Sequence, residues 1–190
     1  MSFSFFLCTY LILKKKDKLY SLILFLGAIN NETMLYLPAL YLIYNVEKVE
    51  LDHLQKLFLK TIKYSIPAFV IVIAIRWYNF ERPHLGGAYH LEHNLRHLTP
   101  LLKVYGIGWF FPLLFYLKLP LFFRRAYLSI PFFIIPHLIT GKIEETRQML
   151  PLAIIILPAC MISILQAVDL IIPQKFHQSS WYALLKIKKK

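Results

Sequence analysis

Asn31, Glu32 and Thr33 form the first of three polar groups that interrupt a largely apolar sequence. They offer an amide, a carboxylate and a hydroxyl, with almost no connecting chain between two apolar segments. An ionisable group at membrane depth is destabilising unless it is paired or hydrated, and Arg147 is the expected partner of Glu32. Three interpretations stay open: an acid in the hydrated interface, a structural ion pair or helix cap by Asn31 or Thr33, and a contact to substrate.

The second group, Glu144, Glu145 and Arg147, follows Gly141 and precedes a long apolar run. Acidic residues suit the positive end of a helix, so a helix start is the first interpretation. In the second, Glu144 or Arg147 faces a cavity and contacts a phosphate or a sugar hydroxyl, for which the guanidinium fork is well shaped.

The third group contains His90, His93 and His97, which a helix would bring to one face. Imidazoles at this spacing can share a metal ion, but no His-Glu-x-x-His motif is present and neither cysteine lies nearby. An amphipathic helix lying in the membrane interface is therefore favoured over a metal site. Cys8 and Cys160 lie in separate apolar runs and indicate neither a disulfide framework nor a metal site.

The composition indicates what kind of protein must position these groups. Of the 190 residues, 58% are hydrophobic and 17% are charged, and the mean hydropathy is +0.55. Soluble domains have roughly 45–50% apolar and about 25% charged residues, so a soluble body and a disordered chain are both excluded. The net charge of +12 comes from clusters between apolar runs, which favours membrane topology over a nucleic-acid partner.

Seven apolar blocks approach the roughly 17–25 residues that a membrane-spanning helix needs. They predict an all-α transmembrane bundle of about seven helices, several of them short or kinked, as one domain over residues 1–170, with an outer loop at 78–100 and a basic cytoplasmic tail at 171–190. The second and third blocks are short, and an alternative joins them into one broken or re-entrant element. The blocks are Met1–Leu13, Leu19–Ile29, Met34–Val46, Tyr64–Trp77, Leu101–Leu117, Ala126–Thr140 and Met149–Leu170.

The basic residues predict the orientation of these blocks. If all seven cross, sixteen of the 22 Lys and Arg residues fall on one side of the membrane and six on the other. Since cytoplasmic loops are enriched in Lys and Arg, the N-terminus is expected outside and the C-terminus in the cytoplasm. A fused second and third block would break the pattern, because it would separate the lysines at 14–18 from the loop at 47–63. All three polar groups then lie on the extracytoplasmic face.

Two motifs carry a resemblance to a known family. The run Leu26–Thr33, followed by the apolar segment Met34–Tyr44, resembles a G-x-x-N-x-E-T segment of bacterial polytopic membrane proteins related to C-type (GT-C) glycosyltransferases. The run Gly141–Arg147, followed by Leu150–Pro151, is similar to a later G-x-x-E-x-R segment of those proteins. The similarity is to the C-terminal half of the family, whose members act in the plasma (inner) membrane.

The resemblance implies transfer of a sugar from a polyprenyl-phosphate carrier at the outer face. Because the family's catalytic acid lies in an earlier part of the fold, it implies no catalytic residue here. The expected partners are membrane lipids, a polyprenyl-phosphate sugar and another membrane subunit, with no nucleic acid, cofactor or metal. A non-catalytic membrane subunit and a transporter or flippase component are the alternatives. The candidate substrate-lining residues are Asn31, Glu32, Thr33, Glu144, Glu145 and Arg147.

Overall fold

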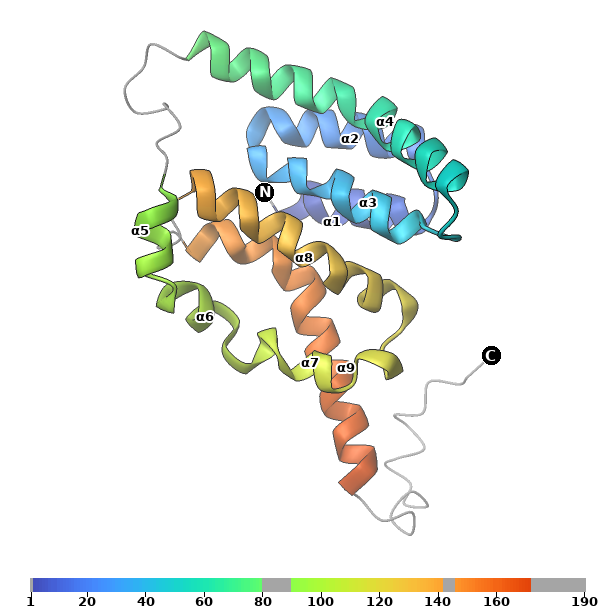
Figure 1. The fold of residues 1–190 in the computed structure, drawn as a ribbon, viewed down its shortest axis with the longest axis vertical. Coiled ribbons are helices and arrows are strands. Elements are labelled where there is room, and N and C mark those ends of the chain that lie inside the picture. The colour runs from blue at the N-terminus through green and yellow to red at the C-terminus, as the bar shows by residue number, and fades with distance from the viewer. Residues whose placement is uncertain (1, 80–89, 142–145, 172–190) are drawn as a thin grey trace.

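The computed structural model describes residues 2–79, 90–141 and 146–171, and within these ranges the chain forms helices and no strand. The all-α class is therefore confirmed for the described residues. Their arrangement is drawn in Figure 1. The helices are α1 (Ser2–Leu13), α2 (Asp17–Asn30), η1 (Glu32–Tyr36), α3 (Leu37–Asn45), α4 (Leu51–Tyr78), α5 (Leu91–Arg96), α6 (Thr99–Tyr105), η2 (Gly106–Trp109), α7 (Phe111–Leu114), η3 (Tyr116–Lys118), α8 (Leu121–Thr140), η4 (Thr146–Leu152) and α9 (Ala153–Ile171).

A tight turn of lysines joins α1 to α2. Lys15 has the left-handed backbone conformation (φ +52°), and the amide of Lys16 donates to the carbonyl of Leu11 at 3.0 Å. This six-to-one bond with a left-handed residue inside it is the helix-ending Schellman arrangement. The turn ends α1 and reverses the chain, so that α2 packs back along α1.

The helices α2 and α4 pack in parallel with a constant register. Asp17 pairs with Lys60 at 2.7 Å, and the Ser21 hydroxyl donates to the carbonyl of Tyr64 at 2.7 Å, 43 residues along the chain. The α4 face toward α2 includes small buried side chains such as Ser65 and Ala68, which permit a close approach of the two helices. A constant offset means that both helices run in the same direction, as two crossings separated by one return segment would.

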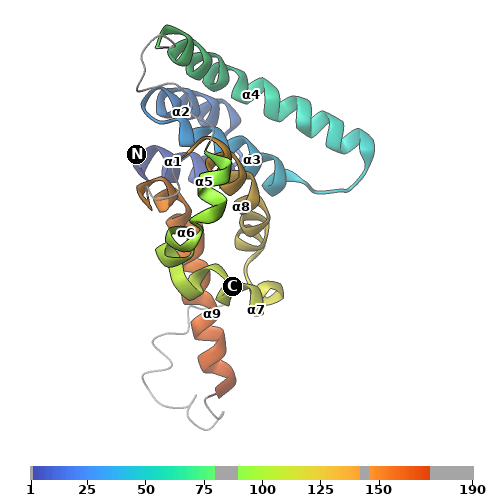
Figure 2. The ribbon, with the colours of Figure 1, turned by 60° about the vertical axis from the view of Figure 1, so that its left-hand side comes forward.

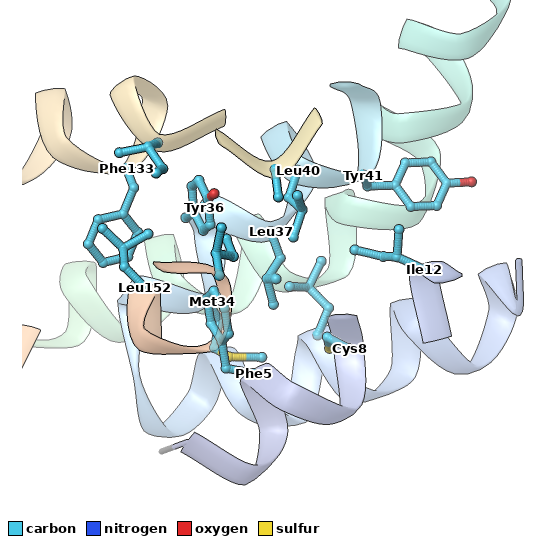
Figure 3. Close-up of a cluster of buried hydrophobic side chains, with 14 of the residues drawn as sticks. Phe5, Cys8, Ile12, Met34, Tyr36, Leu37, Leu40, Tyr41, Phe133 and Leu152 are labelled. Atoms are coloured by element: carbon cyan, nitrogen blue, oxygen red, sulfur yellow. The ribbon is translucent and has the colours of Figure 1, made fainter. Parts of the chain in front are cut away.

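The core lies where α3 packs between α1 and α8 (Figure 3). The Tyr36 ring stacks on Phe5 of α1 at 5.9 Å and meets Phe133 of α8 edge-on at 4.9 Å. Met34 fills the space beside Gly27 of α2, where an added Cβ would lie 2.5 Å from its terminal methyl carbon. The first three apolar blocks therefore pack as three separate helices around one buried centre.

In the second half of the chain, two segments again run in the same direction, with α8 between them in the sequence. Tyr105 donates to the carbonyl of Met149 at 2.6 Å, and Gln166 donates to the carbonyl of Lys118 at 3.0 Å. These bonds make the segment from α6 to η3 run parallel to η4 and α9. Figures 1 and 2 show α9 extending away from the layer of α1 to α4 at a steep angle.

Only some of the predicted blocks are continuous helices. The fifth block was expected as one helix over Leu101–Leu117, and this is wrong: the chain there breaks into α6, η2, α7 and η3. The physical causes are Gly106, whose φ of +50° leaves the helical region, and Pro112, which lacks an amide donor. By contrast, α4 has 28 residues, about 42 Å, and begins well before the predicted Tyr64.

By length and hydropathy, two helical segments of the described residues qualify as membrane spans, namely Leu51–Tyr78 and Gln148–Val168. Seven crossings are therefore more than these criteria establish. Many apolar side chains nevertheless face outward. On α4 they include Ile66 (50% exposed) and Ile73 (62% exposed), and on α9 Met161 (66% exposed). Apolar surface on this scale favours a lipid or protein covering over water.

A core truncation tests the packing around α3. Replacing Leu40, which is fully buried, with Ala should lower the free energy of unfolding by about 2–5 kcal/mol because it leaves a cavity. The matched control is Leu22→Ala on the outer face of α2, where Leu22 is 51% exposed and the change should be small. The measurement is thermal unfolding of the detergent-solubilised chain, and equal shifts for both variants would contradict the core described here.

Candidate functional site

The first polar group forms a capped turn between α2 and η1. Asn31 has an extended backbone (φ −157°), and its side-chain oxygen accepts a hydrogen bond from the amide of Thr33 at 2.9 Å. The backbone amide of Asn31 donates to the carbonyl of Gly27, and this bond closes the end of α2. The prediction that Asn31 or Thr33 caps the next helical segment is therefore confirmed for Asn31.

Glu32 pairs with Arg76 in the last turn of α4. The guanidinium Nε donates to Oε1 at 2.9 Å, and Nη2 contacts Oε2, so the pair is a two-bond fork. Both side chains are about half exposed (47% for Glu32 and 52% for Arg76). Such paired bonds hold both groups in a defined plane. This arrangement is a mixed-charge surface at one end of the molecule, accessible to a ligand.

Arg147 was the expected partner of Glu32, whereas the partner found among the described side chains is Arg76. The reason is the parallel register of α2 and α4, which brings a residue 44 positions along the chain beside Glu32. No sequence pattern indicates this pairing, because it depends on which helices are neighbours. Glu144 and Glu145 lie outside the described residues, as does the side chain of Arg147, so their predicted roles stay predictions.

Thr33 lies on the inner side of this turn. Its hydroxyl oxygen is buried and has no hydrogen-bond partner among the described residues. The side chains of Asn31 and Thr33 are part-buried, whereas Glu32 is exposed. Of the three predicted residues, Glu32 is therefore the one presented to a ligand, and Asn31 positions it by capping the turn.

Asn94 connects α5 to the end of α8, a role that no sequence pattern indicates. Its side chain is fully buried and donates to the carbonyls of Leu138 and Gly141 at 2.8 and 2.7 Å. The amide of His90 also donates to the carbonyl of Ile139 at 2.9 Å. These bonds satisfy carbonyl groups that the end of a helix leaves without partners.

The three histidines lie in and beside the short helix α5. His90 precedes the helix and His97 follows it, and the rings of His93 and His97 stack with centroids 4.5 Å apart. His97 Nδ1 lies 2.9 Å from the carbonyl oxygen of His93. Within the described part of the chain, no cluster of three or more His, Cys, Asp or Glu side chains could hold a metal ion.

A second polar set lies at the opposite end of the helices. Lys15 pairs with Glu47 at 3.0 Å, and Arg125 Nη1 donates to the carbonyl oxygen of Tyr44. Glu47 is exposed, and its hydrogen bond and attraction to Lys15 lower the pKa of its carboxyl group. In the sequence these lysines predicted only the orientation in the membrane, and their pairing with acids was not predicted.

These contacts sort by the predicted sides of the membrane. Glu32 in the first outer connection meets Arg76 at the start of the second, and Asn94 in the second meets Gly141 at the start of the third. Contacts between the inner connections form a separate set. The lysine cluster at 14–18 and the loop at 47–63 lie at the same end, which is contrary to a fused second and third block.

Comparisons with protein-family models, with curated proteins and with solved structures found no match to this chain.

A double-mutant cycle tests the outer ion pair. Arg76→Gln leaves the Glu32 carboxylate without its fork and should destabilise the chain, whereas adding Glu32→Gln should recover part of the loss. The coupling free energy expected for a half-exposed pair is about 0.5–1 kcal/mol. Arg96→Gln serves as the control, because the Arg96–Glu92 pair is more exposed and lies within one helix. A coupling of zero in thermal unfolding would mean that the Glu32–Arg76 contact is not populated.

Proposed function

We propose that this chain is an integral membrane protein that crosses the bilayer seven times, with the N-terminus outside and the C-terminus in the cytoplasm. The observation that carries the proposal is the separation of the polar contacts into two sets at opposite ends of the helices. Each contact between connections joins two segments that the positive-inside rule assigns to the same side. The membrane expected is the bacterial plasma (inner) membrane.

The short helices are compatible with this proposal. α1 has 12 residues, about 18 Å, which is less than the roughly 30 Å of hydrocarbon in an average bilayer. A short helix is accommodated by local thinning and by long side chains that reach the interface. The Lys14 ammonium lies 5.7 Å from the centroid of the Tyr10 ring, an arrangement suited to an interfacial end.

For its biochemical role, we propose a partial or divergent GT-C-like glycosyltransferase that acts at the outer face on a polyprenyl-phosphate sugar. The proposal rests on the resemblance of the Leu26–Thr33 segment and on the half-exposed Glu32–Arg76 fork. A guanidinium that faces the aqueous boundary can bind a phosphate with two hydrogen bonds. Glu32 would orient Arg76 and accept sugar hydroxyl hydrogen bonds, and it is assigned no catalytic proton transfer.

A specific feature of the broken fifth block favours the alternative of a non-catalytic membrane subunit. Ile107 is 75% exposed, Leu114 77% and Leu117 80%. Irregular backbone at membrane depth is tolerated only where protein or water covers it. A partner helix against this face would supply the covering. A transporter or flippase component is the third candidate, in which the same fork would bind a moving substrate.

Labelling with a membrane-impermeant maleimide tests the topology. In a chain with Cys8 and Cys160 replaced by Ala, Leu95→Cys should label in intact cells, because Leu95 is exposed near the outer end. Lys48→Cys should label only after the membrane is permeabilised. The reverse pattern would invert the orientation and remove the outer-face site, and equal labelling of both in intact cells would contradict a sealed, sided arrangement.

Reconstitution into liposomes with a polyprenyl-phosphate sugar separates the three roles. Cleavage of the sugar-phosphate bond is expected for the glycosyltransferase. Transbilayer movement without cleavage would instead indicate a flippase, and carrier binding alone a subunit. Arg76→Gln should weaken carrier binding by about tenfold, the size of a lost charge-assisted hydrogen bond. Lys103→Gln, a like charge change on the exposed side of α6, should leave binding unchanged.

A further inference from the structure

A pocket of about 300 Å³ lies at the inner end of the helices, opposite the Glu32–Arg76 fork. Three parts of the chain that are distant in sequence form it: the turn after α1, the end of α3 and the start of α8. Its charged groups are two cations and one carboxylate. The lining residues are Lys15, Tyr44, Asn45, Glu47, Leu121 and Arg125.

The backbone of Lys15 is held in place by the end of α1. The left-handed conformation at this position belongs to the helix-ending turn, so the turn determines the position of the Cα. The ammonium group pairs with Glu47 at 3.0 Å, with both side chains about two-thirds exposed. Exposed pairs of this kind contribute little to stability, so a stronger anion can displace the carboxylate.

Arg125 supplies the second cation from the first turns of α8. One of its terminal nitrogens donates to the carbonyl of Tyr44, which anchors the guanidinium against the end of α3. A guanidinium has five N–H donors, so one bond to a carbonyl leaves donors for an anion in the pocket. The Tyr44 ring packs edge-on against Phe122 at 5.7 Å, and this contact gives the pocket an apolar wall.

The start of α8 adds a third favourable feature. Leu121, the first residue of α8, lines the pocket. The preceding residue is Pro120, and no side chain among the described residues caps this helix start. The first amides of a helix without a cap point toward solvent and carry the positive end of the helix dipole. The helix dipole and the guanidinium group of Arg125 therefore both favour a negatively charged ligand.

We propose that this pocket binds the phosphate group of an anionic ligand between Lys15 and Arg125, with the ligand replacing Glu47 as the partner of Lys15. At neutral pH the Glu47 carboxyl is ionised, since Lys15 lowers its pKa, and it therefore competes with the ligand for the ammonium group. A phosphate has more acceptor oxygens than a carboxylate and matches the Arg fork. The phosphate could belong to a lipid headgroup or to a soluble phosphate ester, and both have the same recognition chemistry.

Binding to the full chain in nonionic detergent, followed by native mass spectrometry, tests the site with three probes. Dioctanoyl phosphatidylglycerol carries a lipid-linked phosphate, dioctanoylglycerol lacks the phosphate, and glycerol 3-phosphate lacks the lipid. Phosphatidylglycerol should bind at least about tenfold more tightly than dioctanoylglycerol, because charge-assisted hydrogen bonds to the phosphate are lost in the latter. Stronger binding of phosphatidylglycerol than of glycerol 3-phosphate assigns the site to a lipid, and comparable binding of the two assigns it to a soluble ester.

Four variants make the test specific to the pocket. Lys15→Asn removes the charge and keeps a residue that accepts the left-handed conformation. Arg125→Gln removes the guanidinium group. Each variant should weaken phosphate binding about tenfold. Glu47→Gln removes the competing carboxylate and should strengthen it, a gain that misfolding would not produce. Lys48→Gln is the matched control, a charge loss at an exposed neighbouring position, and should leave binding unchanged.

Two results would overturn the proposal. One is equal binding of dioctanoylglycerol and phosphatidylglycerol, which would mean that the phosphate is not recognised. The other is an equal loss of binding in Lys15→Asn and Lys48→Gln. This result would mean that the phosphate is attracted only by the overall positive charge at this end of the molecule and not by the pocket. Neither result depends on the proposed glycosyltransferase activity, so the two proposals fail separately.

Discussion

The parallel register between α2 and α4 determines where the charged groups of the first half of the chain lie. An offset of 43 or 44 residues joins Ser21 to Tyr64 and Glu32 to Arg76. Two parallel helices joined through an antiparallel one must have matching ends, so the acids and bases separate into two sets at opposite ends of the helices. In a bilayer this separation is also the favourable one, because the polar ends meet water and the apolar lengths meet lipid.

The two ends present different chemistry. At one end Glu32 and Arg76 neutralise each other in a two-bond fork, and Asn94 connects α5 to the last turn of α8. At the opposite end the cations exceed the acids in the pocket, and among the described residues the weak Lys15–Glu47 pair is the only ion pair on the pocket wall. One end therefore has a guanidinium already paired with a carboxylate, and the other has more cations than acids.

The sequence predicted the features that depend on local patterns and missed those that depend on neighbours. Apolar blocks predicted an all-helical chain, basic clusters predicted which connections share an end, and an Asn before an acidic turn predicted the cap at Asn31. The pairing of Glu32 with Arg76 depends on tertiary packing. The break at Gly106 was missed because hydropathy is insensitive to a left-handed backbone angle, and the two hydrogen bonds of Asn94 leave no periodic signal.

The central claim is that lipid surrounds the outward-facing apolar side chains, and spin-label accessibility tests it most directly. In a chain without Cys8 and Cys160, reconstituted in liposomes, a label at Phe69→Cys on α4 should relax strongly with oxygen and weakly with a water-soluble nickel chelate. A label at Val49→Cys, in the exposed connection before α4, should show the opposite preference. If the label at position 69 responded to the nickel chelate as strongly as the label at position 49, water would surround that face and the account would be wrong.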